Sequence, residues 1–294
     1  MIRYPITAND LDNRIKKLKP TWFGRAQDVL DALSDEPKSS DFKGLWSEIK
    51  DVYIDLQHSK CAFCEKPLEG RIEQDIEHFR PKTGVDAWQP PIDLVQAGIK
   101  VKQPANGRTE PGYRLLAYHP LNYAATCKNC NTIFKQNLFP IAGTRKPDTK
   151  RPPAKSTERP YLIYPIGDAD DDPEQLIEFT GCVPQPAKSP GHDRFRAQAT
   201  ISIFKLDDPL ERRVFYQGRA KAIQSIFLNL VAIDDSGEAA LVAAAKKNVR
   251  RMLQDAEPYA NCLRCFSRLY AQSRAEATEV FTDLTELLDS ISPT

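Results

Sequence analysis

Two Cys-x-x-Cys pairs, at Cys61–Cys64 and Cys127–Cys130, lie on either side of a Glu77-His78 dipeptide. Four thiolates complete a tetrahedral zinc site and leave no open position for a substrate. A histidine beside a carboxylate, with the Asn131 amide downstream, supplies the groups that hydrolysis of a phosphodiester with a single metal ion needs. We therefore predict a structural zinc ion and a separate catalytic centre; the predicted zinc ligands are Cys61, Cys64, Cys127 and Cys130.

The cysteine pattern leaves two alternatives open. The gap between the two pairs is longer than in common zinc ribbons, and an insertion at Thr83–Gly112 explains it. The pairs would otherwise be unrelated buried or redox cysteines. A third pair, Cys262–Cys265, has no matching partner, so a second metal site would need Cys182 and His192.

The composition is that of a soluble globular protein, with 41% hydrophobic and 28% charged residues. The formal net charge of +1 excludes a strongly basic chain, so any nucleic-acid surface must be a local patch. A basic run within Gly143–Pro160 is one candidate. The N-terminus lacks a signal-peptide core, and no segment is apolar enough to cross a bilayer, which predicts a cytoplasmic protein without membrane contact.

Hydrophobic periodicity divides the chain into four segments. We expect a helical segment at 1–58, a chemical core at 59–142 with an inserted loop at 83–112, and a basic Pro-rich connection at 143–160. The rest, 161–294, should begin with strands and end in helices.

Four short stretches are predicted strands, because apolar and β-branched residues recur in them. They are Ile72–Phe79, Tyr161–Pro165, Ile177–Phe179 and Ile201–Phe204. Apolar residues at helical spacing predict helices from Pro209 onward.

The order of the motifs within Cys61–Pro140 resembles that of the HNH endonucleases, the ββα-metal nucleases. Cys-x-x-Cys is followed by Glu-His-x-x-Pro-Lys, an Asn, and Cys-x-x-Cys-Asn-x-x-x-Lys. The resemblance implies an α+β fold, in which a zinc-stabilised ββα-metal HNH core lies between an N-terminal helical segment and a mostly helical C-terminal region.

The flanking segments are similar to those of HNH nucleases encoded beside retrons and in Septu-type anti-phage systems. The matching features are Leu45-Trp46, Tyr161–Ile166, the acidic Asp170–Glu174 and Thr200–Leu206. Those nucleases work with an ABC/SMC-like ATPase. The resemblance therefore implies an endonuclease that acts on DNA in anti-phage defence, with an ATPase as its partner.

The resemblance also assigns roles by position. His78 would be the general base that activates water, and Asn122 would hold the catalytic loop and orient the histidine. Glu77 and Asn131 would bind a catalytic Mg²⁺ or Mn²⁺ ion through oxygen atoms. The residues expected to contact phosphates are Arg80, Lys82 and Lys135.

Several points stay open at this level. Asp75 lies on the same face of the predicted strand as Glu77, so either carboxylate is a possible metal ligand. His119 is an alternative base. The whole chain is alternatively a zinc-stabilised module that binds nucleic acid or docks a partner without catalysis.

Overall fold

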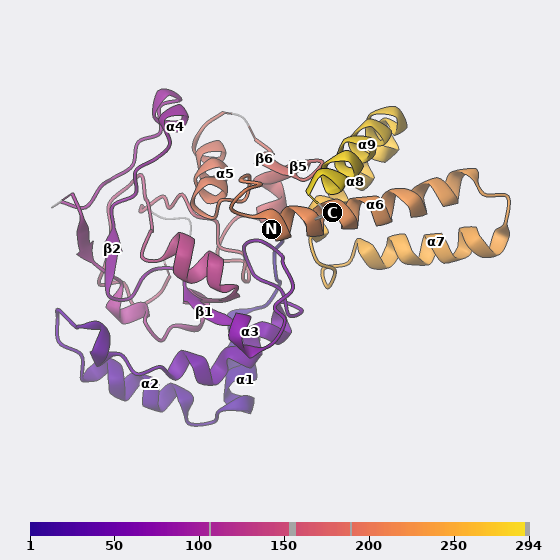
Figure 1. Ribbon diagram of the computed structural model, residues 1–294. Coiled ribbons are helices and arrows are strands. Elements are labelled where there is room, and N and C mark those ends of the chain that lie inside the picture. Colours follow the sequence, from indigo (N-terminus) through magenta and orange to yellow (C-terminus); the bar gives the residue numbers. More distant parts are fainter. Residues whose placement is uncertain (106, 153–156, 189, 292–294) are drawn as a thin grey trace.

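The computed structural model describes residues 1–105, 107–152, 157–188 and 190–291, and its fold is α+β (Figure 1). The described N-terminal helices are α1 (Ala8–Leu18), α2 (Trp22–Asp31) and α3 (Lys50–Leu56). They lie on one side of the central strand β1, and the C-terminal helices lie on the other (Figure 1). No helix in the described ranges combines the length and apolar character needed to cross a membrane.

Three two-stranded antiparallel sheets are found among the described residues. The first joins β1 (Asp75–His78) to β4 (Tyr123–Thr126), with His78 opposite Tyr123. The second pairs β2 (Gly84–Asp86) with β3 (Thr109–Pro111), and the third pairs β5 (Ile177–Thr180) with β6 (Val183–Pro186). The first sheet places the end of the Glu-His strand beside the segment that leads into the second cysteine pair.

A π-helix, η6 (Asn129–Lys135), follows β4 after a short turn. Its wide turn is closed by the Gln136 amide, which donates to the Asn131 carbonyl at 2.8 Å. Turns of this kind are rare and occur often at functional sites. The predicted inserted loop contains β2, β3 and the short helix α4 (Ile92–Gln96).

The C-terminal region is mainly helical. Its helices are α5 (His192–Ile203), α6 (Arg213–Asp235), α7 (Ala239–Met252), α8 (Ala260–Gln272) and α9 (Arg274–Ile291). Helices α6 and α7 form an antiparallel hairpin that projects from the rest of the molecule (Figure 1). The helices expected after Pro209 are thus present.

Two of the predicted strands are wrong, and a third is shorter than expected. Ile201 and Ile203 lie in α5, whose inner face is buried, so tertiary packing overrides the strand preference of a β-branched run. Tyr161–Pro165 is irregular, because the Ile163 amide donates to the Thr200 hydroxyl at 3.2 Å instead of to a neighbouring strand. The predicted strand Ile72–Phe79 is confined to β1, since a 3₁₀ turn occupies its first residues.

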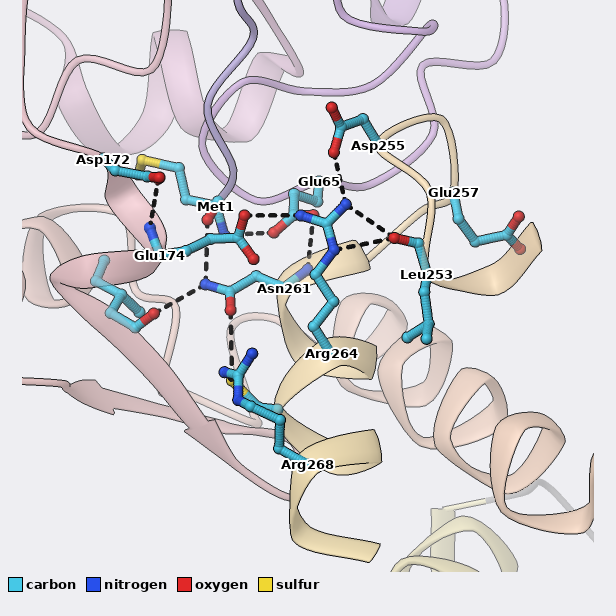
Figure 2. Close-up of polar contacts among 12 residues, drawn as sticks. Met1, Glu65, Asp172, Glu174, Leu253, Asp255, Glu257, Asn261, Arg264 and Arg268 are labelled. Atoms are coloured by element: carbon cyan, nitrogen blue, oxygen red, sulfur yellow. Dashed lines mark hydrogen bonds and ion pairs between the residues drawn. The ribbon is translucent and has the colours of Figure 1, made fainter. Parts of the chain in front are cut away.

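A buried polar network joins the first cysteine pair to helix α8 (Figure 2). The Met1 amino group forms an ion pair with the carboxylate of Glu65, which follows Cys64 directly. The Asn261 side chain donates to the Met1 carbonyl at 3.1 Å, and the Asn261 amide donates to Glu65 at 3.4 Å. The start of the chain, the first Cys-x-x-Cys turn and the C-terminal helices therefore form one packed unit.

A four-cysteine cluster beside a Glu-His pocket

The four predicted zinc ligands meet in the interior. Their sulfur atoms all lie within 4.8 Å of one another; they belong to Cys61, Cys64, Cys127 and Cys130. The Cys64 and Cys127 sulfurs are 3.8 Å apart, which is too far for a disulfide of about 2 Å. A tetrahedral zinc ion with Zn–S bonds of about 2.3 Å separates its sulfurs by about 3.8 Å. The cluster therefore fits a zinc ion.

The other three cysteines lie apart from this cluster and hydrogen-bond to protein oxygens. The Cys262 thiol donates to the Gly181 carbonyl at 3.3 Å, and the Cys265 thiol donates to the Asn261 side chain at 3.4 Å. Cys182 contacts the Tyr216 carbonyl at 3.9 Å. Across the described part of the chain, the four-cysteine cluster is the one group of His, Cys, Asp or Glu side chains close enough to share a metal.

His78 ends β1, and its ring is fixed on three sides. Its Nε2 lies 3.1 Å from the Ala117 carbonyl oxygen, and the rings of Trp46 and Tyr123 meet it edge to face, with centroids at 4.7 and 5.0 Å. A carbonyl oxygen only accepts, so the neutral ring carries its proton on Nε2 and keeps the lone pair on Nδ1. Burial, and then the nearby Lys82 ammonium, lowers the pKa of His78 well below its ordinary value. The imidazole is thus held neutral, with its lone pair on Nδ1.

A cavity of about 250 Å³ lies next to this ring. Glu77 and His78 reach it from β1, Asn131 from η6, and Lys82 from the turn after β1. The fold therefore gathers four of the predicted site residues around one small pocket. Trp46, from the N-terminal region, also lines the cavity.

Lys135 is held inside the protein. Its side chain is fully buried, its ammonium pairs with the Glu77 carboxylate, and it donates to the His78 carbonyl at 3.1 Å. Burial raises the pKa of Glu77, and the Lys135 charge opposes that effect. Lys135 thus acts on the carboxylate of the pocket and is not exposed on a surface that phosphates reach.

Asn122 fixes the backbone that follows His78. Its Oδ1 accepts from the Arg80 amide at 2.8 Å, and its Nδ2 donates to the carbonyls of Arg80 at 3.0 Å and Leu116 at 3.1 Å. The side chain is fully buried. This geometry gives Asn122 a holding role on the loop after β1.

Arg80 is likewise engaged within the protein. Its Nε donates to Glu158 at 3.3 Å, and its guanidinium lies 5.0 Å from the centre of the Phe139 ring. Glu158 is fully buried and also accepts from the Tyr113 hydroxyl at 2.9 Å. Of the three predicted phosphate contacts, Lys82 alone lines the pocket, with its ammonium 4.6 Å from the Trp46 ring centre.

The basic connection 143–160 is partly folded onto the core. Arg145 pairs with Glu110 and donates to the Tyr113 hydroxyl at 2.9 Å. Backbone bonds such as Gly143 to the Glu158 carbonyl, at 2.9 Å, hold its two ends together. Residues 153–156 lie outside the described ranges.

Sequence reasoning missed Trp46 and Glu158 as functional neighbours. Trp46 has the same helical periodicity as the core residues around it, and Glu158 stands among cations in a polar stretch. Trp46 was noted only as part of the Leu45-Trp46 flank, and Glu158 belongs to no motif, so only the folded contacts reveal what the two side chains touch.

The alternative base, His119, has a different task. It begins the turn Pro120–Asn122, and its Nδ1 accepts from the Leu121 amide at 3.2 Å. Partial burial, and then the Arg151 charge, lowers its pKa to about 4. The residue caps a turn that leads to Asn122 and β4.

His119 makes stability sensitive to acid. The ordinary histidine pKa of 6.5 applies to the unfolded chain, so as the pH falls from about 6.5 to 4 the unfolded state binds a proton that the folded state refuses. We expect His119 to remove up to about 3 kcal/mol of stability across this window and no more below it. In His119→Asn, whose amide oxygen still caps the Leu121 amide, this loss should be absent. Urea unfolding of both proteins at pH 7, 5 and 4 measures the difference, and parallel losses would contradict it.

Comparison with known proteins gives one informative match. No protein-family model matches the chain, and no solved structure matches it. Septu protein PtuB from Bacillus mycoides (strain KBAB4) is 30% identical over 189 residues, which cover 64% of this chain and 55% of that protein. The match thus spans about half the length of that relative. The similarity supports a relationship between this chain and the Septu proteins, as the flanking segments predicted.

Proposed function

We propose that this protein is a metal-dependent endonuclease of the HNH type that hydrolyses phosphodiester bonds, with DNA as the favoured substrate. The observation that carries the proposal is the pocket where Glu77 and His78 from β1 meet Asn131 from η6. The similarity to a Septu protein supports a role as the effector nuclease of an anti-phage defence complex.

His78 is the general base in this proposal. Its Nδ1 takes a proton from a water molecule, and the resulting hydroxide attacks the phosphorus atom. The bond from Nε2 to the Ala117 carbonyl becomes charge-assisted once the ring is protonated, which stabilises the imidazolium. Lys82 lies at the same pocket and offers a positive charge to the phosphate.

The pocket offers oxygen donors that suit a hard divalent cation such as Mg²⁺ or Mn²⁺. Glu77 would hold the ion through its carboxylate, which also pairs with Lys135, and Asn131 would add its amide oxygen. When bound, such an ion neutralises charge on the phosphate and on the leaving oxygen. Asp75, two residues before Glu77 on β1, is the alternative ligand.

A pair of isosteric variants separates these ligands. Glu77→Gln removes the charge of the buried carboxylate, and we expect it to raise the Mg²⁺ concentration needed for half-maximal cleavage by at least tenfold, the loss typical of groups that tune a metal. Asp75→Asn, on the more exposed end of β1, is expected to need the same Mg²⁺ concentration as the wild type. Titrations of plasmid cleavage with Mg²⁺ measure both, and the reverse ranking would assign the ion to Asp75.

The substrate and the metal requirement are tested together. Purified protein is incubated with supercoiled DNA, single-stranded DNA and RNA, each with Mg²⁺, Mn²⁺ or EDTA. We expect metal-dependent cleavage of DNA. Cleavage that persists in EDTA would contradict the metal requirement, and cleavage confined to RNA would change the substrate.

An ABC/SMC-like ATPase is the proposed partner. The projecting hairpin of α6 and α7 leaves Leu228 59% and Leu241 48% exposed, which suits a docking surface (Figure 1). Expression of a tagged chain together with a candidate ABC/SMC-like ATPase tests the interaction. If Leu228→Glu and Leu241→Glu leave co-purification unchanged, the hairpin is not the docking site.

A further inference from the structure

A buried arginine from the C-terminal region touches the four-cysteine cluster. Arg212 directly precedes α6 and is only 4% exposed. Its Nη2 lies 3.3 Å from the Cys130 sulfur. In the part of the chain that the structure describes, the buried Nε of Arg212 has no hydrogen-bond partner. The cysteine sulfur is therefore the acceptor that the structure offers to this guanidinium.

The remaining surroundings of Arg212 are aromatic. Its guanidinium lies 5.0 Å from the centre of the Phe134 ring and 5.1 Å from that of Phe215. Phe134 belongs to η6, and Phe215 belongs to α6. Aromatic faces attract a cation but do not neutralise it. A charge buried in this way is costly unless hydrogen-bond acceptors or an anion compensate it, and Arg212 has no carbonyl acceptor among its described contacts.

The charge of the cluster supplies that anion only when the cysteines are thiolates. A zinc ion bound by four thiolates carries a formal net charge of −2. Such a centre is itself costly to bury, and a cation in hydrogen-bond contact offsets the cost. Four neutral thiols would give Arg212 no countercharge. Arg212 and a metal-bearing cluster therefore stabilise each other.

We propose that Arg212 is an outer-shell residue of the four-cysteine site, where it donates a hydrogen bond to the Cys130 thiolate and helps to retain the zinc ion. The proposal rests on the zinc ion that the four-cysteine cluster fits, and not on the proposed nuclease activity. It also ties the start of α6 to η6, the helix that carries Asn131 and Lys135. The C-terminal helices are then part of what holds the metal centre together.

The protein offers a matched control for this role. Arg219 lies two turns further along α6, is 2% exposed, and has its guanidinium 3.6 Å from the centre of the Phe215 ring. Its Nη1 donates to the carbonyls of Cys182 at 2.8 Å and Leu206 at 3.1 Å, so both of these acceptors are backbone oxygens and neither belongs to the four-cysteine cluster. Arg219→Met thus removes a buried guanidinium from the same helix without removing a partner of the cluster.

The test measures zinc affinity in the absence of DNA. Wild type, Arg212→Met, Arg212→Lys and Arg219→Met are titrated with a chromophoric zinc chelator, and folding is followed by circular dichroism. We expect Arg212→Met to weaken zinc binding about 10–100-fold, the usual effect of losing an outer-shell partner. Arg212→Lys keeps the charge and should recover part of the loss, and Arg219→Met should bind zinc as the wild type does.

Each result decides the proposal. If zinc affinity falls equally in Arg212→Met and Arg219→Met, the cause is a general loss of stability, and the proposal is overturned. Unchanged zinc affinity in Arg212→Met would also overturn it. If Arg212→Met does not fold, Arg212→Lys against Arg219→Met makes the same comparison. A wild type that takes up no zinc also overturns it. If the wild type binds zinc but cuts no DNA, the proposed nuclease activity fails, and the proposal for Arg212 stands on the zinc affinities alone.

Discussion

Replacing His78 with alanine is expected to lower the rate of DNA cleavage by about 10²–10⁴-fold, the contribution of a positioned general base. The ring is held by the Ala117 carbonyl, Trp46 and Tyr123, with Nδ1 free of its proton. No other described imidazole lines the pocket. Initial rates on a duplex oligonucleotide, with saturating Mg²⁺, measure the loss.

His119→Asn is the control for this experiment. His119 caps a turn outside the pocket, so its replacement should leave the cleavage rate at neutral pH unchanged. A large loss in His119→Asn together with full activity in His78→Ala would exchange their roles.

Loss of the zinc ion is expected to have the largest effect on stability. Structural zinc sites contribute about 10–16 kcal/mol, which equals or exceeds the whole stability of a typical domain, about 5–15 kcal/mol. Cys61→Ser should therefore bind no zinc, and its core should not fold, so that no cooperative thermal transition is seen. Zinc content by elemental analysis and thermal unfolding by circular dichroism measure both.

Cys262→Ser provides the comparison, because this buried thiol donates to the Gly181 carbonyl and lies outside the cluster. It should keep its zinc and a single unfolding transition. If Cys61→Ser retains zinc and melts as the wild type does, the four-cysteine site is not structural.

The sequence predicted the four-cysteine cluster and named four residues that the structure brings to one pocket, because both choices depend on residue type and spacing. Two Cys-x-x-Cys turns need only two local loops to meet, and β1 with its partner β4 brings them together. Glu77 and His78 lie close together for a similarly local reason, because they are the last two residues of one strand. The α+β class was implied by the family resemblance, and the structure confirms that class.

Contacts between residues far apart in the chain could not be predicted from the sequence. Whether Arg80 and Lys135 reach phosphates or pair with Glu158 and Glu77 depends on burial, which motif spacing does not encode. The predicted strand at Ile201–Phe204 is wrong for a related reason. The β-branched run at Ile201–Phe204 has strand preference, yet packing against the core makes most of it helical.

One measurement tests the proposed nuclease activity most directly. Wild type and His78→Ala, both shown to contain zinc, are incubated side by side with supercoiled plasmid in Mg²⁺ and in EDTA, with and without the co-expressed ATPase. We predict nicked or linear plasmid only with wild type and Mg²⁺. Equal cleavage by both proteins, or intact plasmid in every lane, would contradict catalysis at His78.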